Sequence, residues 1–204
     1  MTRILFAAVL ITLAVSFPAA ALQVETAATV AFTEGPAVDR DGNVYFTDII
    51  NQRIMKLAAD GSLSTYREKS NLANGLLIDP QGGLIACEGA AFERPGVKLT
   101  GTPRITRTDL KTGKVEVLAD KYEGKPLVGP NDVTLDGPGK LARILAAPDV
   151  QRPNGIQVSP DDRKLYLIEA NNAQGGARLI RAHDLQPDGT VTGRGRSSAG
   201  SRTP

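Results

Sequence analysis

The chain has 204 residues, a net charge of +2 and one cysteine, and these numbers exclude several classes of protein. The small charge is spread along the chain, so nothing in it favours nucleic acid or an anionic surface as a partner. Cys87 alone cannot form an internal disulfide, so burial must stabilise the fold. The 21 glycines, 13 prolines and short apolar runs are typical of many short strands joined by tight turns.

The first 21 residues have the pattern of a secretory signal peptide. A short basic start at residues 1–3 precedes an almost unbroken apolar run over 4–15, and small residues lead up to Ala21. That run is shorter than the about 20 residues that span a bilayer, which disfavours the alternative of a membrane anchor. No later segment is apolar enough to span a membrane. The pattern predicts cleavage after about Ala21 and export to the periplasm or the medium, leaving 204 − 21 = 183 residues for one domain.

An internal repeat begins each time at a polar residue placed just before an apolar run. The four starting residues are Glu34, Asn74, Asn131 and Asn154. An Asp or Ser follows five positions later, and a Gly or Asp eight positions later. These residues are Asp39, Asp79, Asp136 and Ser159, then Gly42, Gly82, Gly139 and Asp162. The first set can cap a turn and the second can adopt its positive φ, so the next strand is expected to return antiparallel.

The sequence pattern predicts four antiparallel strands in each full unit. After the starting strand, the segments expected to be strands are 44–46, 53–57 and 63–66 in the first unit, 84–86, 104–108 and 115–118 in the second, and 165–167, 178–182 and 190–192 in the last. The second unit also has an insertion around 92–101. Four strands in about 40 residues is the repeat of a β-propeller blade, so the predicted fold is all-β and propeller-like.

The spacing of the repeat predicts an irregular array. Glu34 and Asn74 are 40 residues apart and Asn74 and Asn131 are 57 apart, but Asn131 and Asn154 are only 23 apart, which is too short for four strands. The third unit is expected to keep an inner strand at 133–135 and an outer strand at 143–145. About three to four blades are therefore represented, with the third truncated. Residues 193–204 show no strand pattern and are expected to be a disordered tail after a domain at 22–192.

Six short motifs recur in a fixed order over residues 32–192. They are EGP at 34–36, VDRDGNVYFTD at 38–48, ACEG at 86–89, GPND at 129–132, RPNGI at 152–156, and SPD at 159–161 leading into Leu165 and Tyr166. The ordered set resembles the gluconolactonase family, which includes senescence marker protein and luciferin-regenerating enzyme. The resemblance implies a six-bladed propeller with one divalent cation at the mouth of its channel. Six blades need about 240–270 residues, so an incomplete copy is expected.

The repeat register also predicts where a site would lie. The four starting residues occupy the same place in each unit, and a closed propeller would bring them around the channel mouth. Oxygen donors there suit Ca²⁺ or Mg²⁺, whereas Zn²⁺ usually prefers His or Cys. The resemblance implies that Glu34 and Asn154 are metal ligands, and that Asn131 holds substrate or completes the coordination. The structural alternative is a strand cap for Glu34 and turn formation for the asparagines, and this alternative is favoured for Asn74.

The resemblance implies metal-dependent opening of a sugar lactone or a similar cyclic ester, with Ca²⁺ expected and Mg²⁺ or Zn²⁺ as alternatives. No residue matches the family's Asp base, so no catalytic residue is assigned. Two alternatives stay open: a non-catalytic module that binds carbohydrate or a partner, and a truncated inactive product. Cys87 is expected to be a core residue and His183 a surface strand residue, while Glu88 is left open as a residue facing the channel.

Overall fold

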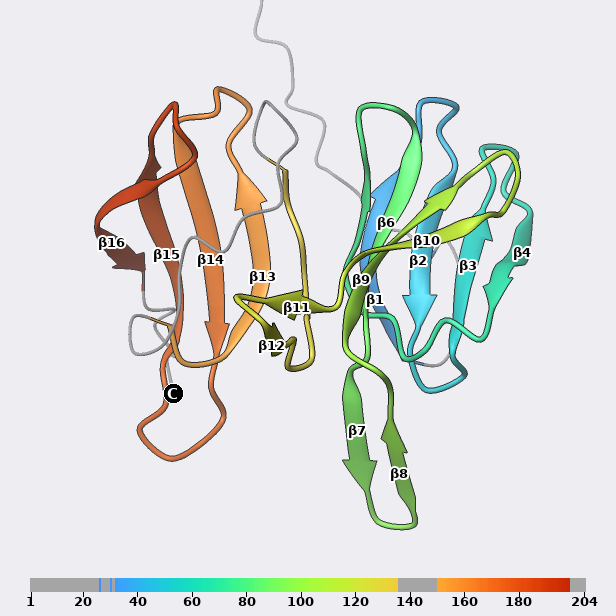
Figure 1. Cartoon of the computed structure of the whole chain (residues 1–204), viewed down its shortest axis with the longest axis horizontal. Helices are drawn as coiled ribbons and strands as arrows, with labels where there is room; N and C mark the ends of the chain where they lie inside the picture. The colour runs from blue at the N-terminus through green and yellow to red at the C-terminus, as the bar shows by residue number, and fades with distance from the viewer. Residues whose placement is uncertain (1–25, 27–29, 31, 136–149, 199–204) are drawn as a thin grey trace, which may run out of the picture.

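The computed structural model describes residues 26, 30, 32–135 and 150–198. The predicted leader at 1–21, the predicted outer strand at 143–145, the turn residues Asp136 and Gly139 and the end of the predicted tail at 199–204 lie outside the described residues. The described residues form three four-stranded antiparallel sheets and two hairpins (Figure 1). No helix among them is long and apolar enough to cross a membrane. The predicted all-β fold built from four-stranded units is confirmed.

The first sheet follows the predicted order of strands. It comprises β1 (Thr33–Val38), β2 (Val44–Asp48), β3 (Arg53–Leu57) and β4 (Leu63–Glu68), in the order β1-β2-β3-β4. The Asp39 carboxylate accepts hydrogen bonds from the backbone N–H of Asp41 (3.0 Å) and Asn43 (2.9 Å), and Gly42 has a φ of 81°. The repeated Asp and Gly therefore make the turn as expected.

The second sheet contains β5 (Leu76–Ile78), β6 (Gly83–Glu88), β9 (Arg104–Asp109) and β10 (Val115–Ala119), in the order β10-β9-β6-β5. Its β5–β6 turn repeats that chemistry, because Asp79 accepts from the N–H of Gln81 (2.9 Å) and of Gly83 (2.8 Å). The predicted insertion is a hairpin of β7 (Ala91–Arg94) and β8 (Val97–Thr100), which extends beyond the sheet (Figure 1). A second hairpin, β11 (Lys121–Tyr122) with β12 (Lys125–Pro126), follows β10.

The third sheet comprises β13 (Pro153–Val158), β14 (Lys164–Ala170), β15 (Arg178–Leu185) and β16 (Val191–Ser198). Its last strand corrects the predicted boundary at residue 192. Residues 193–198 continue β16 and pair with β15, with Ser197 opposite Arg181. Because ladder hydrogen bonds use backbone groups, a segment without an apolar pattern can still extend a strand along an existing edge.

The inner strand predicted at 133–135 is wrong as secondary structure. These residues are described and are not part of a strand. Val133 and Leu135 nevertheless pack against Ile85 and Cys87 of the second sheet. These apolar residues therefore pack in the core, but no described strand pairs with this segment to form a ladder.

The main core lies between the first two sheets. Ala37, Tyr45 and Ile54 of the first sheet pack with Leu76, Leu84 and Ala86 of the second. Tyr45 and Tyr66 meet edge to face with ring centroids 5.1 Å apart. Face-to-face packing of this kind holds consecutive blades together, and it fixes the starts of β1 and β5 relative to each other.

Candidate functional site

The repeat-starting residues lie at successive junctions between the units. Glu34 is in β1, and Thr47 Oγ1 donates to the carbonyl of Glu34 (3.1 Å) and to the carbonyl of Asn74 in the second sheet (3.0 Å). The carbonyl of Asn131 accepts a hydrogen bond from the N–H of Gly75 (2.7 Å). These contacts bring the backbones of Glu34, Asn74 and Asn131 together in the order that the repeat register predicts.

Glycine after the starting residue permits this close approach. A Cβ on Gly35 would lie 2.5 Å from the Asn74 carbonyl oxygen and 2.5 Å from the Gly75 Cα. A Cβ on Gly75 would overlap the carboxylate of Asp132 and the carbonyl of Asn131. Only glycine leaves enough space for the backbones of neighbouring units to meet here.

Asp132 connects the Asn131 loop to the third sheet. One carboxylate oxygen accepts from the N–H of Val133 (2.8 Å), and the other accepts from the N–H of Ile156 in β13 (3.1 Å). Burial raises the pKa of Asp132, and the two N–H donors only partly oppose that effect. Sequence reasoning missed this residue, although a signal was present: Asp132 occupies the repeat position that is glycine in the other three units.

The predicted site residues differ in exposure and pairing. Glu34 is half-buried and Asn154 is exposed. Strand pairing is irregular between Glu34 and Ala37 in β1, and between Pro153 and Gly155 in β13. Irregularities of this kind change the direction of side chains at a strand end and are frequent beside binding sites.

The Asn131 side chain carries the clearest mark of a binding site. Its Oδ1 is buried and has no hydrogen-bond partner among the described residues. A buried acceptor without a donor costs stability unless a ligand, ion or water satisfies it. The described residues contain no group of three His, Cys, Asp or Glu that could hold a metal ion. The predicted donors, the Glu34 carboxylate and the amide oxygens of Asn131 and Asn154, would form an all-oxygen set that suits a hard cation better than Zn²⁺, but no contact among the described residues joins these three side chains.

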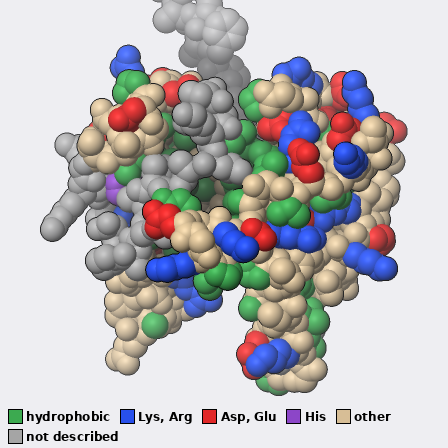
Figure 2. All heavy atoms as spheres, in the orientation of Figure 1, with side chains coloured by type: hydrophobic (Ala, Val, Ile, Leu, Met, Phe, Trp, Pro, Cys, Tyr) green, Lys and Arg blue, Asp and Glu red, His purple; other side chains and the backbone are tan. Residues whose placement is uncertain are grey.

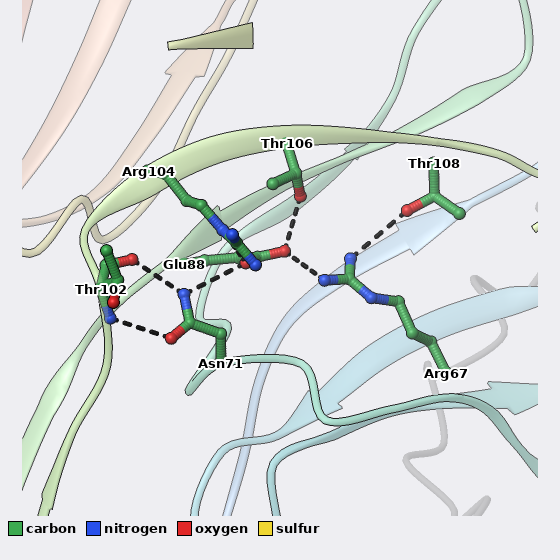
Figure 3. Close-up of polar contacts among 7 residues, drawn as sticks. All are labelled: Arg67, Asn71, Glu88, Thr102, Arg104, Thr106 and Thr108. Carbon is green, nitrogen blue, oxygen red and sulfur yellow. Dashed lines mark hydrogen bonds and ion pairs between the residues drawn. The ribbon is translucent and has the colours of Figure 1, made fainter. Parts of the chain in front are cut away.

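Glu88 is fully buried and its carboxylate is engaged in hydrogen bonds and ion pairs (Figure 3). It accepts from Arg67 of the first sheet, from Thr106 Oγ1 (2.6 Å), from Arg104 Nε (2.7 Å) and from Asn71 Nδ2 (3.2 Å). Burial alone would raise the pKa of Glu88, but the donors Thr106, Arg67 and Arg104 hold it below its usual range. Glu88 therefore joins the first two sheets rather than offering a ligand.

The same arrangement recurs in the other sheets. The buried Asp48 pairs with Arg53 (2.9 Å) and the buried Glu169 pairs with Arg181 (2.9 Å). In each sheet the acid lies near the end of the second strand and the arginine lies on the third. Sequence reasoning missed this repeat of acid and arginine. The residues recur in the sequence, but only the structure shows that they pair.

The burial of two further residues tests their predicted positions. Cys87 is fully buried, and burial together with the nearby Asp132 and Glu88 charges raises its pKa to about 12, so it is a core residue as expected and not a nucleophile. His183 is only 6% exposed, which corrects the prediction of a surface position. It lies opposite Leu165, so it belongs to the inward-facing row of the β14–β15 ladder.

Comparison with known proteins identifies relatives of this chain. Residues 32–143 match the family model of the SMP-30/gluconolactonase/LRE-like region. A gluconolactonase from Zymomonas mobilis is 24% identical, with the match covering 82% of this chain and 56% of that protein. The structure of a gluconolactonase from Xanthomonas campestris has a TM-score of 0.62 at 23% identity, covering 79% of this chain and 60% of that one. Regucalcin, a calcium-binding protein from Agrobacterium tumefaciens, has a TM-score of 0.58 at 16% identity, covering 85% and 60%. The chain thus spans little more than half the length of these relatives.

Proposed function

Since the chain belongs to the SMP-30/gluconolactonase/LRE-like family, we propose that it hydrolyses a lactone with the help of a bound divalent cation. The observation that carries the proposal is the buried, unpartnered Oδ1 of Asn131, which lies at the junction that also brings Glu34 close. Relatives named gluconolactonase and a calcium-binding relative support the reaction and the cation.

The proposed roles follow from the chemistry of each side chain. Glu34 supplies the negative charge, and the amide oxygens of Asn131 and Asn154 complete an oxygen donor set suited to Ca²⁺. When bound, the cation supplies a Lewis acid that polarises the ester carbonyl. The Asn131 amide group can also donate a hydrogen bond to the lactone, and Asp132 holds the Asn131 loop against β13. Addition of water breaks the ring C–O bond of the ester and gives one hydroxy acid.

Cation binding is tested by thermal unfolding of the purified chain with and without millimolar Ca²⁺. A cation bound to the folded state raises Tm by mass action. We expect Ca²⁺ to raise Tm of the native chain, and Glu34→Gln and Asn131→Ala to remove that shift. Asp41→Asn is the matched control, because this exposed carboxylate lies in the turn at the opposite end of β1. A shift that survives Glu34→Gln would contradict the proposed ligand set.

Hydrolysis is tested by following acid release from glucono-δ-lactone in the presence of Ca²⁺. We expect turnover that is lost on chelation and on Glu34→Gln, and retained in Asp41→Asn. Lactone binding without turnover would instead favour the alternative of a binding module. A chain that neither binds lactone nor responds to Ca²⁺ would contradict the proposed function.

The apolar pattern at residues 1–21 supports a separate proposal, export from the cytoplasm. Mass spectrometry of the chain recovered from the periplasm or medium tests it. We expect a mature chain that begins just after Ala21, and a full-length chain found only inside the cell would contradict export.

A further inference from the structure

The β7–β8 hairpin leaves the second sheet at the end where the predicted site residues lie. Leu76, at the start of β5, pairs with Ala86 near the end of β6. The hairpin that follows β6 therefore begins beside Asn74 and extends past the starts of the inner strands (Figure 1). Figure 2 shows it as a separate projection from the body of the molecule. An insertion at this position is placed to contact whatever binds at the starts of the inner strands.

The root of the hairpin is fixed in place. Asn71 donates to the carbonyl of Thr102 (2.8 Å) and its Oδ1 accepts from the Thr102 N–H (2.9 Å), as Figure 3 shows. The N–H of Gly89 donates to the carbonyl of Asn71 (2.8 Å). Asn71 has a φ of 56°, a left-handed conformation that asparagine adopts more readily than most residues. Hydrogen bonds therefore attach the two ends of the hairpin to the connection between the first two sheets.

The hairpin and its root approach the two chain segments that carry the proposed polar ligands. The ring of Phe92 meets the ring of Phe32 edge to face at 5.5 Å, and Phe32 precedes Glu34 by two residues. At the root, just before β7, the Gly89 carbonyl oxygen lies near the other segment, because a Cβ on Gly129 would be 4.0 Å from it and Gly129 precedes Asn131 by two residues. The hairpin itself thus contacts the Phe32 segment, and its root lies near the Gly129 segment.

The face of the hairpin that meets Phe32 carries three apolar residues. Phe92 pairs with Leu99 and Arg94 pairs with Val97, so strand alternation places Phe92, Leu99 and Val97 on one face, with Arg94 in the same row next to the turn. Phe92, Leu99 and Val97 are half-buried, whereas Glu93 and Lys98 of the other face are exposed. Phe32 remains 45% exposed despite its contact with Phe92. An apolar surface consequently continues from the hairpin to the start of β1.

We propose that the β7–β8 hairpin is a wall of the ligand site, and that its apolar face together with Phe32 selects lactones that carry an alkyl substituent over sugar lactones. This inference rests on the proposed lactone hydrolysis. The polar groups of Glu34 and Asn131 would bind the ester, and the substituent would extend along the apolar face. Each methylene buried there improves binding about fourfold.

The test measures kcat/KM for δ-valerolactone, δ-octalactone, δ-decalactone and glucono-δ-lactone in saturating Ca²⁺, with calorimetric binding of the same compounds. We expect kcat/KM to rise with chain length and to exceed that for glucono-δ-lactone. Phe92→Ala should lower kcat/KM for δ-decalactone about tenfold and leave δ-valerolactone within about twofold. Val117→Ala is the matched control, because it removes an exposed apolar side chain from β10. The Ca²⁺-induced rise in Tm shows that each variant is folded.

The outcomes separate this inference from the function on which it rests. Turnover of glucono-δ-lactone with no dependence on chain length would overturn the inference and leave the proposed function standing. If kcat/KM of Phe92→Ala still rose with chain length as in the native protein, the hairpin would not be the source of the preference. Binding of Ca²⁺ with no binding or turnover of any lactone would overturn both.

Discussion

The junction between the first two sheets and the junction before the third sheet are built differently. The first combines an apolar core with the Glu88 carboxylate, which binds Arg67 across the interface. The second connects through the Asn131 loop, where Asp132 accepts from the Ile156 N–H. Beside it, Tyr166, Ile168 and Ile180 of the third sheet remain 41%, 42% and 44% exposed. Because stacked units gain stability from their interfaces, the first two sheets should unfold together and the third should be held less firmly.

Removal of the Glu88 carboxylate should break the first junction most severely. Glu88→Ala leaves the Arg67 and Arg104 charges without their buried partner, and the loss of one member of a buried ion pair costs about 3–5 kcal/mol. Urea denaturation measures the change in the free energy of unfolding. Glu93→Ala is the control, because its ion pair with Lys98 is 3.8 Å long and exposed, so it should cost less than about 1 kcal/mol. Equal effects of the two changes would show that Glu88 does not join the sheets.

Crowding of the backbone at Gly35 tests the same junction without a change in charge. Gly35→Ala combines a φ of 49° with overlap against the Asn74 carbonyl, and we expect a loss of about 2–4 kcal/mol in the free energy of unfolding. Gly61→Ala has a φ of 86° but meets nothing within 4 Å, so it isolates the conformational strain and should cost about 1 kcal/mol. Similar losses in both variants would mean that contact between the units contributes little.

The repeat register predicted most of the strands and the junctions, because local chemistry determines them. The Asp and Gly turn residues act within a few positions of each other, as Asp39 and Gly42 show. The register also placed Glu34, Asn74 and Asn131 at successive junctions, while their roles as ligands stay predictions. The inner strand expected at 133–135 is wrong, because this segment has no strand partner among the described residues, although Val133 packs beside Ile85.

The buried charges could not be predicted from the sequence, because their partners come from different units. Arg67 reaches Glu88 across the interface between the first two sheets, and no local spacing indicates that contact. Asp132 bonds to Ile156, which lies 24 residues away. The end of β16 was missed for another reason, since its pairing with β15 uses backbone groups and leaves no pattern in the side chains.

Acid should destabilise the first two sheets by protonating buried carboxylates that are ionised and paired in the folded protein. The pKa values of Glu88 and Asp79 are lowered in the folded protein, so each carboxylate stabilises the fold above its unfolded pKa, about 4.3 for Glu and 3.9 for Asp. That contribution is lost as the pH falls through this range towards the lower folded pKa. We expect the free energy of unfolding to drop steeply below about pH 4.3, and Glu88→Gln to make the drop shallower. An unchanged slope in Glu88→Gln would contradict the role of this carboxylate.

Substitutions on the exposed face of the third sheet should change stability least. Ile168 and Ile180 lie opposite each other in the β14–β15 ladder, so Ile168→Thr with Ile180→Thr places two polar groups on an already exposed surface. We expect a change within about 0.5 kcal/mol, as for most surface substitutions, but less self-association in sedimentation velocity, because adjoining apolar side chains form a contact surface. Val128→Ser is the control, since Val128 is 95% exposed in a loop and lies outside this face. The double variant could instead lose as much free energy of unfolding as Gly35→Ala. That result would show that the third sheet is packed as tightly as the first two, and it would contradict the proposed difference between the junctions.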